Sequence, residues 1–254
     1  MNCKYLVLVF TFFFSSNCIA QLVNIESRRM HTDSIRFVLD SDLSFSYNNN
    51  DGDYIFQLGG ALSSQVKSKD LKKLYFLIGN YNLIRSENED FQNSWFLHLR
   101  FNYEISNFFR MEAFVQSQHN ELLDVNLRNL IGVGPRLKLL SKEHLKLYWG
   151  NAYMYEAEKS NAIGKRSYDS RHSTYLSATI LAMDGAISII NTIYYQPRYS
   201  DFSDYRISEQ FKTEIPISKS INVFALFNYY FDSLTPLDRK EFSTNLSLGI
   251  GFNF

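Results

Sequence analysis

Apolar and polar residues alternate along most of the chain with a period of two. In SWFLHLRFNYE, residues 94–104, Trp95, Leu97 and Leu99 fall on one side of an extended strand, whereas His98 and Arg100 fall on the other. Such alternation is typical of a strand with one apolar face, and no long segment has the 3.6-residue period of an amphipathic helix. The pattern therefore predicts an all-β protein.

Twelve segments carry this alternation, at residues 35–47, 54–66, 73–85, 92–104, 108–118, 126–139, 145–157, 171–182, 186–197, 204–215, 221–231 and 242–254. The connections after the even-numbered segments are compact, as in MDG. Those after the odd-numbered segments are generally longer and more polar, as in EKSNAIGKRSYDS. Bacterial outer-membrane barrels have an even strand number, short periplasmic turns and longer outward loops. These features predict a transmembrane, antiparallel up-and-down β-barrel of about twelve strands, and a soluble β-sandwich is the alternative.

The last predicted strand, NLSLGIGFNF, is apolar on one side and small and polar on the other. Its apolar side carries Leu248, Ile250, Phe252 and the final residue Phe254. A terminal aromatic residue in such a strand resembles the signal by which the outer-membrane assembly machinery recognises its substrates. We expect these four residues to form that assembly signal, and the strand to close the barrel against the first one.

The first 20 residues have the layout of a secretory signal peptide. Lys4 precedes an apolar run at 5–14, and small and polar residues follow up to Ala20. A lipoprotein signal at Cys18 is the alternative. We therefore expect a leader at 1–20, a periplasmic segment at 21–34 that could instead fold into the lumen, and the barrel at 35–254.

Composition adds limits to this picture. The sequence has 22 Phe, 17 Tyr and 4 Pro, and its mean hydropathy is slightly negative, which fits alternating faces better than transmembrane helices. Both cysteines, Cys3 and Cys18, lie in the expected leader, so the processed chain has no thiol and no cysteine metal site. Charges nearly balance, and no nucleic-acid partner is implied. The expected partners are outer-membrane lipid and the assembly machinery, and the oligomeric state stays open.

Three stretches carry a family resemblance. They are LSFSYNNNDGDYIFQLGGALSSQVKSKDLKKLYFLIGNYNLIRS, NSWFLHLRFNYEISNFFRMEAFVQSQHNELLDVNLRNLIGVGPRLKL and FNYYFDSLTP. They resemble domain-of-unknown-function family 481, in the salt-induced outer-membrane form of Bacteroidetes-like bacteria, over roughly residues 35–254. The resemblance implies a barrel in the outer membrane. It implies no activity and no catalytic residues.

Charged residues gather on the predicted inner face of the strands. They are Arg36, Asp40, Asp42, Arg100, Glu104, Arg110, Glu112, Arg128, Arg136, Lys138, Arg206, Lys212 and Glu214. One interpretation is a pore whose charge rings select solutes. The other is a lumen filled by ion pairs, because buried charges must be paired. Both signs occur on neighbouring strands, which favours the filled lumen.

The sequence offers few candidates for other chemistry. Ser117 and His119 share the predicted lipid face and raise the alternative of an outer-leaflet lipid hydrolase, although the barrel phospholipases have histidine before serine. For NNNDGD at 48–53, a hairpin turn is the favoured interpretation and a calcium loop is the alternative. GVGP at 132–135 fits relief of crowding inside the barrel better than a nucleotide loop.

His98, His144 and His172 are expected on different strands, without a carboxylate at ligand spacing. We expect no cofactor, no metal and no catalytic site. The sequence leaves three functions open: a small-solute channel, a stress-related or structural envelope barrel with a sealed lumen, and the lipid hydrolase.

Overall fold

The computed structural model describes residues 36–50, 53–86, 92–121, 125–160, 166–234 and 242–253. They form twelve strands: β1 (Phe37–Asn50), β2 (Asp53–Lys67), β3 (Lys73–Ser86), β4 (Gln92–Glu104), β5 (Phe109–Asn120), β6 (Val125–Ser141), β7 (Leu145–Ser160), β8 (Arg166–Ala182), β9 (Ile187–Arg198), β10 (Asp201–Pro216), β11 (Ile221–Asp232) and β12 (Phe242–Asn253). A single 3₁₀ turn, Met183–Gly185, links β8 and β9. In these ranges no helix is long and apolar enough to span a membrane. The expected leader, the 21–34 segment, the centre of the NNNDGD turn and Phe254 lie outside the described residues.

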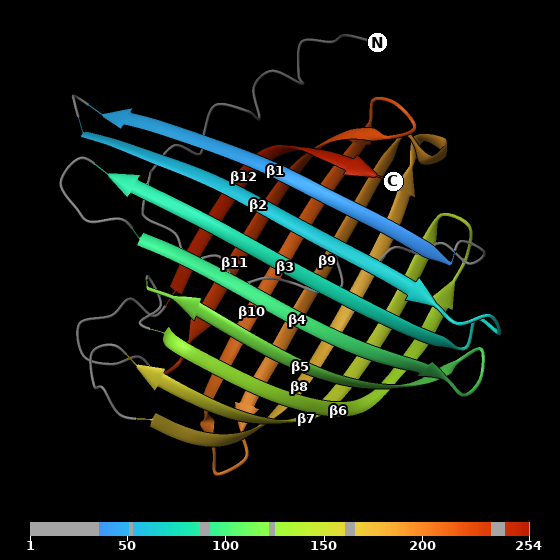
Figure 1. Ribbon diagram of the computed structural model, residues 1–254. Helices are drawn as coiled ribbons and strands as arrows, with labels where there is room; N and C mark the ends of the chain where they lie inside the picture. The colour runs from blue at the N-terminus through green and yellow to red at the C-terminus, as the bar shows by residue number, and fades with distance from the viewer. Residues whose placement is uncertain are drawn as a thin grey trace, which may run out of the picture.

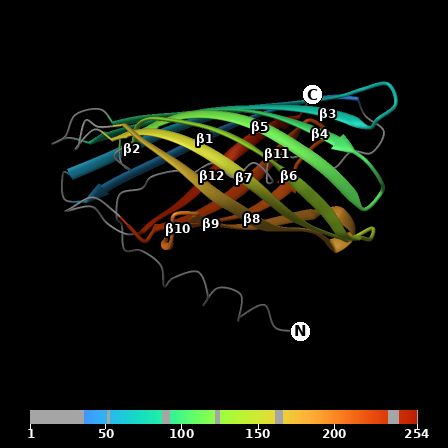
Figure 2. The ribbon, with the colours of Figure 1, turned by 90° about the horizontal axis from the view of Figure 1, so that it is seen from below.

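The strands form one closed antiparallel barrel. Each strand pairs with its neighbours in the sequence, and β12 returns to pair with β1. Figure 1 shows the strands of one wall, β1 to β6, crossing those of the other, β8 to β12, as the tilted strands of a barrel do. Seen from below in Figure 2, the strand ends gather at two opposite ends of the molecule. The predicted up-and-down barrel of twelve strands is confirmed, and the β-sandwich alternative is wrong.

Among the described residues, the seam between β1 and β12 is the shortest ladder. It joins five residue pairs, from Asp40↔Asn253 to Ser44↔Gly249, whereas β1 and β2 pair continuously from Phe37↔Val66 to Asn50↔Asp53. Glycine permits the close contact at this seam, because a Cβ on Gly249 would lie 2.5 Å from the backbone oxygen of Leu43. The small residues on the inner face of β12 therefore allow it to pair closely with β1 and close the barrel.

The two faces of the barrel have opposite character. Leu99 on β4 and Leu248 on β12 point outward and are 49% and 65% exposed. Polar side chains point inward and are buried, and His98 is completely inaccessible. In a soluble protein the apolar side chains lie inside and the polar ones outside, so this arrangement is the reverse. It is typical of a barrel with a polar lumen and an apolar outer belt.

The connections differ from the prediction. We call the end with the start of β1 and the end of β12 the turn end, and the opposite one the loop end. Turn-end connections, such as 105–108 and 142–144, are short as expected. At the loop end, however, β7 continues to Ser160, β8 begins at Arg166 and β10 begins at Asp201, so the long loops predicted at 158–170 and 198–204 are mostly strand. The polar residues in these segments continue the two-residue alternation of the strands. The prediction assigned them to loops because they are polar.

The outward face yields a test of the barrel. Leu99→Arg should lower the free energy of unfolding by roughly 2–4 kcal/mol, because it places a charge in the lipid-facing belt. The control is Ser220→Arg in the exposed turn between β10 and β11, where about 0.5 kcal/mol or less is expected. Urea unfolding in lipid vesicles, followed by tryptophan fluorescence, measures both. Equal tolerance of arginine at the two positions would show that the facing is wrong.

Candidate functional site

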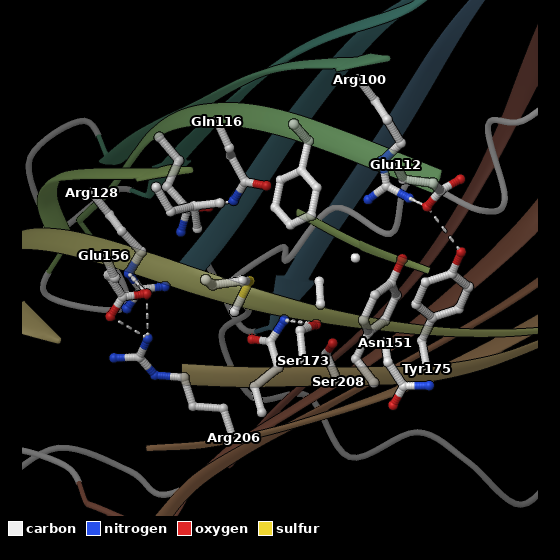
Figure 3. A pocket seen from close by; sticks show the side chains of 18 of the residues that line it. Arg100, Glu112, Gln116, Arg128, Asn151, Glu156, Ser173, Tyr175, Arg206 and Ser208 are labelled. Atoms are coloured by element: carbon white, nitrogen blue, oxygen red, sulfur yellow. Dashed lines mark hydrogen bonds and ion pairs between the residues drawn. The ribbon is translucent and has the colours of Figure 1, made fainter. Parts of the chain in front are cut away.

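The lumen holds two clusters of paired charges, separated by a small cavity (Figure 3). The loop-end cluster contains Arg128, Glu156, Glu158, Arg171, Asp204, Arg206 and Asp232. The turn-end cluster contains Arg100, Glu112, Arg136 and Tyr175. All of these residues lie on inward positions of their strands, because the side chains on one face of a strand are two residues apart. We take the two clusters and the cavity as the candidate functional site.

Arg206 on β10 organises the loop-end cluster. Its Nη1 donates to both carboxylate oxygens of Glu156, at 2.9 and 3.0 Å, and its Nη2 lies 3.1 Å from Oε2 of Glu158. Its Nε donates to Asp232 Oδ2 at 2.9 Å. Hydrogen bonds between a guanidinium group and a carboxylate are charge-assisted and roughly twice as strong as those between neutral groups. Because Glu156 is on β7, this contact crosses the lumen between strands that are not neighbours.

Two further arginines, Arg128 and Arg171, extend this cluster. Arg128 Nε lies 2.6 Å from Glu158 Oε2. Arg171 Nη2 lies 2.9 Å from Asp204 Oδ1, and its Nε lies 3.6 Å from Glu156 Oε1. Glu156 thus contacts guanidinium groups from three strands, β6, β8 and β10. A carboxylate in this position is stabilised only while those partners remain.

The turn-end cluster centres on the carboxylate of Glu112. Arg100 Nη1 donates to Glu112 Oε2 at 2.8 Å, and Asn102 Nδ2 donates to Oε1 at 2.6 Å. The Tyr175 hydroxyl donates to Oε2 at 3.3 Å and accepts from Arg136 Nε at 3.1 Å. The Arg136 guanidinium also stacks on the Tyr148 ring, with its Cζ 3.7 Å from the ring centre. Tyr175 on β8 reaches Glu112 on β5, so this cluster also crosses the lumen.

The cavity between the clusters is small. It measures about 60 Å³ and is bordered by Phe114, Gln116, Met154, Tyr194 and Tyr230, with both clusters at its ends. A buried water needs roughly 10–15 Å³ measured in this way, so a few waters fit and a large solute does not. Gly134 lines the cavity, and a Cβ on it would lie 1.9 Å from the backbone oxygen of Asn151. A Cβ on Gly132 would meet the ring of Phe114, which also lines the cavity. The prediction that GVGP relieves crowding is confirmed.

Outside the clusters, the other predicted inner charges lie in several places. Lys212 contacts Asp42 at 3.3 Å across the lumen and also pairs with Glu214. Arg110 and Glu104 pair with each other near the turn end, where both are partly exposed. Asp40 and Lys138 are half-buried on their inner faces. Arg36 does not face the lumen. It precedes β1 at the exposed turn end, where its backbone oxygen accepts from the Lys67 N–H and its Nε donates to the Lys67 carbonyl oxygen.

Ser117 and His119 lie on the outer face of β5, as expected, but they do not form a nucleophile–base pair. The Ser117 hydroxyl donates to Asn129 Oδ1 at 2.7 Å. His119 Nδ1 lies 2.6 Å from the Asn126 carbonyl oxygen, so Nδ1 carries the proton, and Nε2 faces Glu121 at 3.7 Å. A general base has to accept a proton from its nucleophile, and here Nε2 points to a carboxylate instead.

The three histidines lie apart. His98 is buried in the lumen beside Gln116, with 3.1 Å between Nδ1 and Oε1, and His172 is on the outer face of β8. His144 is in the turn between β6 and β7, not on a strand as predicted, because β7 begins one residue later. In the described part of the chain, no three His, Cys, Asp or Glu side chains converge as metal ligands would.

Several members of the loop-end cluster were missed by the sequence reasoning. Glu158 was placed in a loop, and Glu156, Arg171, Asp204 and Asp232 were not named as inner residues. The signal was present, since Glu156 and Glu158 alternate with Tyr155 and Ala157 in the same two-residue pattern as the rest of β7. Extending the alternation past the expected strand ends would have placed Glu158 and Asp232 inside, whereas Glu156, Arg171 and Asp204 already lay within the expected strands.

An apolar outer belt, a closed ladder of twelve strands and a lumen crossed by ion pairs define the class: an up-and-down barrel with the architecture of a membrane-spanning barrel. The chain belongs to the family of proteins of unknown function called DUF481, whose sequence profile matches residues 56–254. The family resemblance is confirmed, although the profile begins later than the resemblance did. The salt-induced type stays a prediction.

Solved structures share the fold at low sequence identity. The NanC porin is 11% identical, with a TM-score of 0.54 over 85% of this chain and 98% of that one. The COG4313 outer membrane channel from Pseudomonas putida F1 is 9% identical, with a TM-score of 0.54 over 92% and 99%. At this identity the likeness shows the fold alone. Comparison with the curated proteins finds no significant match.

The clusters make a stability prediction with a matched control. Glu156→Ala removes the carboxylate that contacts Arg128, Arg171 and Arg206, and it should cost about 3–5 kcal/mol of unfolding free energy, because three buried guanidinium groups each lose one of their carboxylate partners. Glu104→Ala removes the partner of Arg110 at the partly exposed rim, where about 1 kcal/mol or less is expected.

Urea unfolding of both variants in lipid vesicles gives the two values. A loss for Glu156→Ala no larger than that for Glu104→Ala would contradict the buried, dry character of the loop-end cluster.

Proposed function

We propose that this protein is a non-enzymatic barrel of the bacterial outer membrane whose lumen is closed to large solutes by its paired charges. In the resting state it passes at most water and small ions. The observation that carries the proposal is the contact between Arg206 on β10 and Glu156 on β7, together with that between Tyr175 on β8 and Glu112 on β5. Each of these contacts crosses the lumen between strands that are not neighbours. The cavity that lies between them has room for a few water molecules.

The proposed location rests on the chain itself. The outward belt of leucine, isoleucine and aromatic side chains would be costly in water and favourable in lipid. The expected leader at 1–20 would export the chain. The last strand, with Leu248, Ile250 and Phe252 outward, would present the assembly signal to the insertion machinery, with Phe254 as its end. A role in envelope stress follows from the family resemblance alone and is part of the same proposal.

Two alternatives compete with the closed barrel. The first is an open small-solute channel. It draws support from the porin and channel fold, and it predicts that the charge pairs are wet and easily broken. The second is the lipid hydrolase, for which Ser117 and His119 have the required outward position but not the required mutual contact. We favour the closed barrel because the arginines of the two clusters are almost wholly buried.

Conductance tests the closed lumen. Purified wild-type protein in planar bilayers should conduct poorly. Glu112→Ala leaves Arg100 and Arg136 without the carboxylate that they share, so water should enter and the current should rise and favour anions. The midpoint of thermal unfolding should fall in the same variant, because an unmatched buried charge is costly. Glu104→Ala at the rim is the control, with little change expected in either quantity.

Two results taken together would reject the closed lumen. They are a high wild-type conductance and an unchanged unfolding midpoint for Glu112→Ala. In an open, wet pore the charges are screened, and each pair contributes at most about 1 kcal/mol. That outcome would leave the solute channel standing.

Lipid hydrolysis is tested separately. The purified protein, supplied with calcium and mixed phospholipid micelles, should release no fatty acid, because the Ser117 hydroxyl is bonded to Asn129 and not to a base. Release by the wild type that is lost in Ser117→Ala would establish the hydrolase instead. Asn93→Ala, on the outer face of β4, serves as the surface control.

A further inference from the structure

One acidic side chain interrupts the apolar outer belt. Glu209 lies on the outward face of β10, and its neighbours on that face along the strand are Ile207 and Phe211. The other outward Lys, Arg, Asp and Glu residues of the described strands are within two residues of a strand end: Lys73, Arg85, Lys159, Arg166 and Asp201. Such positions reach the membrane surface, whereas Glu209 is eight residues from the start of its strand. An ionisable residue facing lipid away from the strand ends calls for a function.

The contacts of Glu209 are few. Asn191 on β9 donates from Nδ2 to Glu209 Oε1 at 2.8 Å. The register sets Ile193 directly opposite Glu209 on β9 and Tyr229 directly opposite on β11. In the described part of the chain, the bond to Asn191 is the one hydrogen bond of the carboxyl group. A carboxyl group can accept about four hydrogen bonds, and an amide has two donors and an acceptor, so most of this capacity faces outward.

Unsatisfied hydrogen-bonding groups on Glu209 and Asn191 are unfavourable in a lipid environment. Acyl chains form no hydrogen bonds, and a polar group left without a partner among them typically costs several kcal/mol of free energy. The nearest row of side chains toward the loop end includes Tyr195 and Phe231, whose rings both pack against Tyr205. The polar pair is therefore set inside an aromatic and aliphatic surface and not at its edge.

We propose that the outer face of β9, β10 and β11 is the interface between two copies of this chain in the membrane, with Asn191 and Glu209 at its centre. The two residues are a donor and an acceptor on adjacent strands. A two-fold axis that passes between them would bring Asn191 of each copy to Glu209 of the other, which is the self-complementary arrangement that an isologous dimer needs. Each copy would then satisfy the other's outward hydrogen-bonding groups.

A second copy fits this surface better than a basic partner protein does. A cationic partner would need its own charge in the belt, at a further desolvation cost, whereas a second copy brings a neutral amide and an identical carboxyl group. Ile193 and Phe211, which flank the polar pair, supply the apolar contact around it. This inference rests on the membrane location in the proposed function. It does not depend on whether the lumen is open.

Single cysteines test the interface. Both native cysteines precede residue 20, so a processed chain carries only the introduced thiol. Ile193 lies beside the proposed axis, and Ile193→Cys should form a disulfide-linked dimer in native membranes on mild oxidation. Leu99→Cys is similarly exposed on β4, outside the proposed face, and should stay monomeric.

The role of the carboxyl group is tested in the same background. Glu209→Leu should reduce the Ile193→Cys dimer about tenfold, the order expected for losing two polar contacts within a membrane. Glu209→Gln keeps a hydrogen-bonding group and should retain the dimer. Heat-modifiable migration on gels reports that each variant is a folded barrel, and Glu209→Leu should fold at least as well as wild type because it removes a polar group from the belt.

Equal crosslinking at positions 193 and 99, an undiminished dimer in Glu209→Leu, or disulfides to another protein identified by mass spectrometry would each overturn the proposal. A folded monomer in the membrane fraction refutes the dimer alone. Absence of the protein from that fraction refutes the proposed function together with it.

Discussion

The closed backbone ladder is the constraint on which the rest of the structure depends. In lipid, every backbone N–H and C=O needs a partner within the protein, and a sheet meets this requirement only by pairing its last strand with its first. Here that pairing is the five-residue seam between β1 and β12, and Gly249 allows its close approach. Closure fixes which side chains face inward, and it thereby determines that many charged residues of both signs share a narrow interior.

The charges inside the barrel follow from this closure. Inward arginines and carboxylates lose water, and they are stable only as pairs. Pairs between adjacent strands, such as Arg100 with Glu112, add to the ladder, whereas Arg206 with Glu156 and Lys212 with Asp42 join strands that are three places apart in the ring. The latter contacts therefore link strands that share no ladder. In the proposed function, the same contacts that satisfy the charges also obstruct the lumen.

The sequence predicted the strands well and the contacts of the site poorly. Alternation is a local property, so the strand number, the facing of Leu99 and Arg100 and the closed barrel could all be inferred from it. The strand ends at the loop end could not, because polar residues such as Glu158 and Asp201 suit a loop or a protruding strand equally well. The partner of Arg206 could not either, since a contact between β7 and β10 depends on strand tilt and barrel width, which no local pattern encodes.

The side chains that fill the lumen are apolar in one part of it and charged in another. Phe76 and Ile78 on β3 and Phe96 on β4 pack together inside the barrel, whereas ion pairs fill the interior between Arg100 on β4 and Arg206 on β10. Apolar residues of similar volume often close an interior with equal or greater stability than buried ion pairs do. Folding alone therefore does not require charges on the second side. Their presence fits a lumen that can rearrange and admit water or ions along β5 to β10, while the apolar side stays packed and holds the barrel in shape.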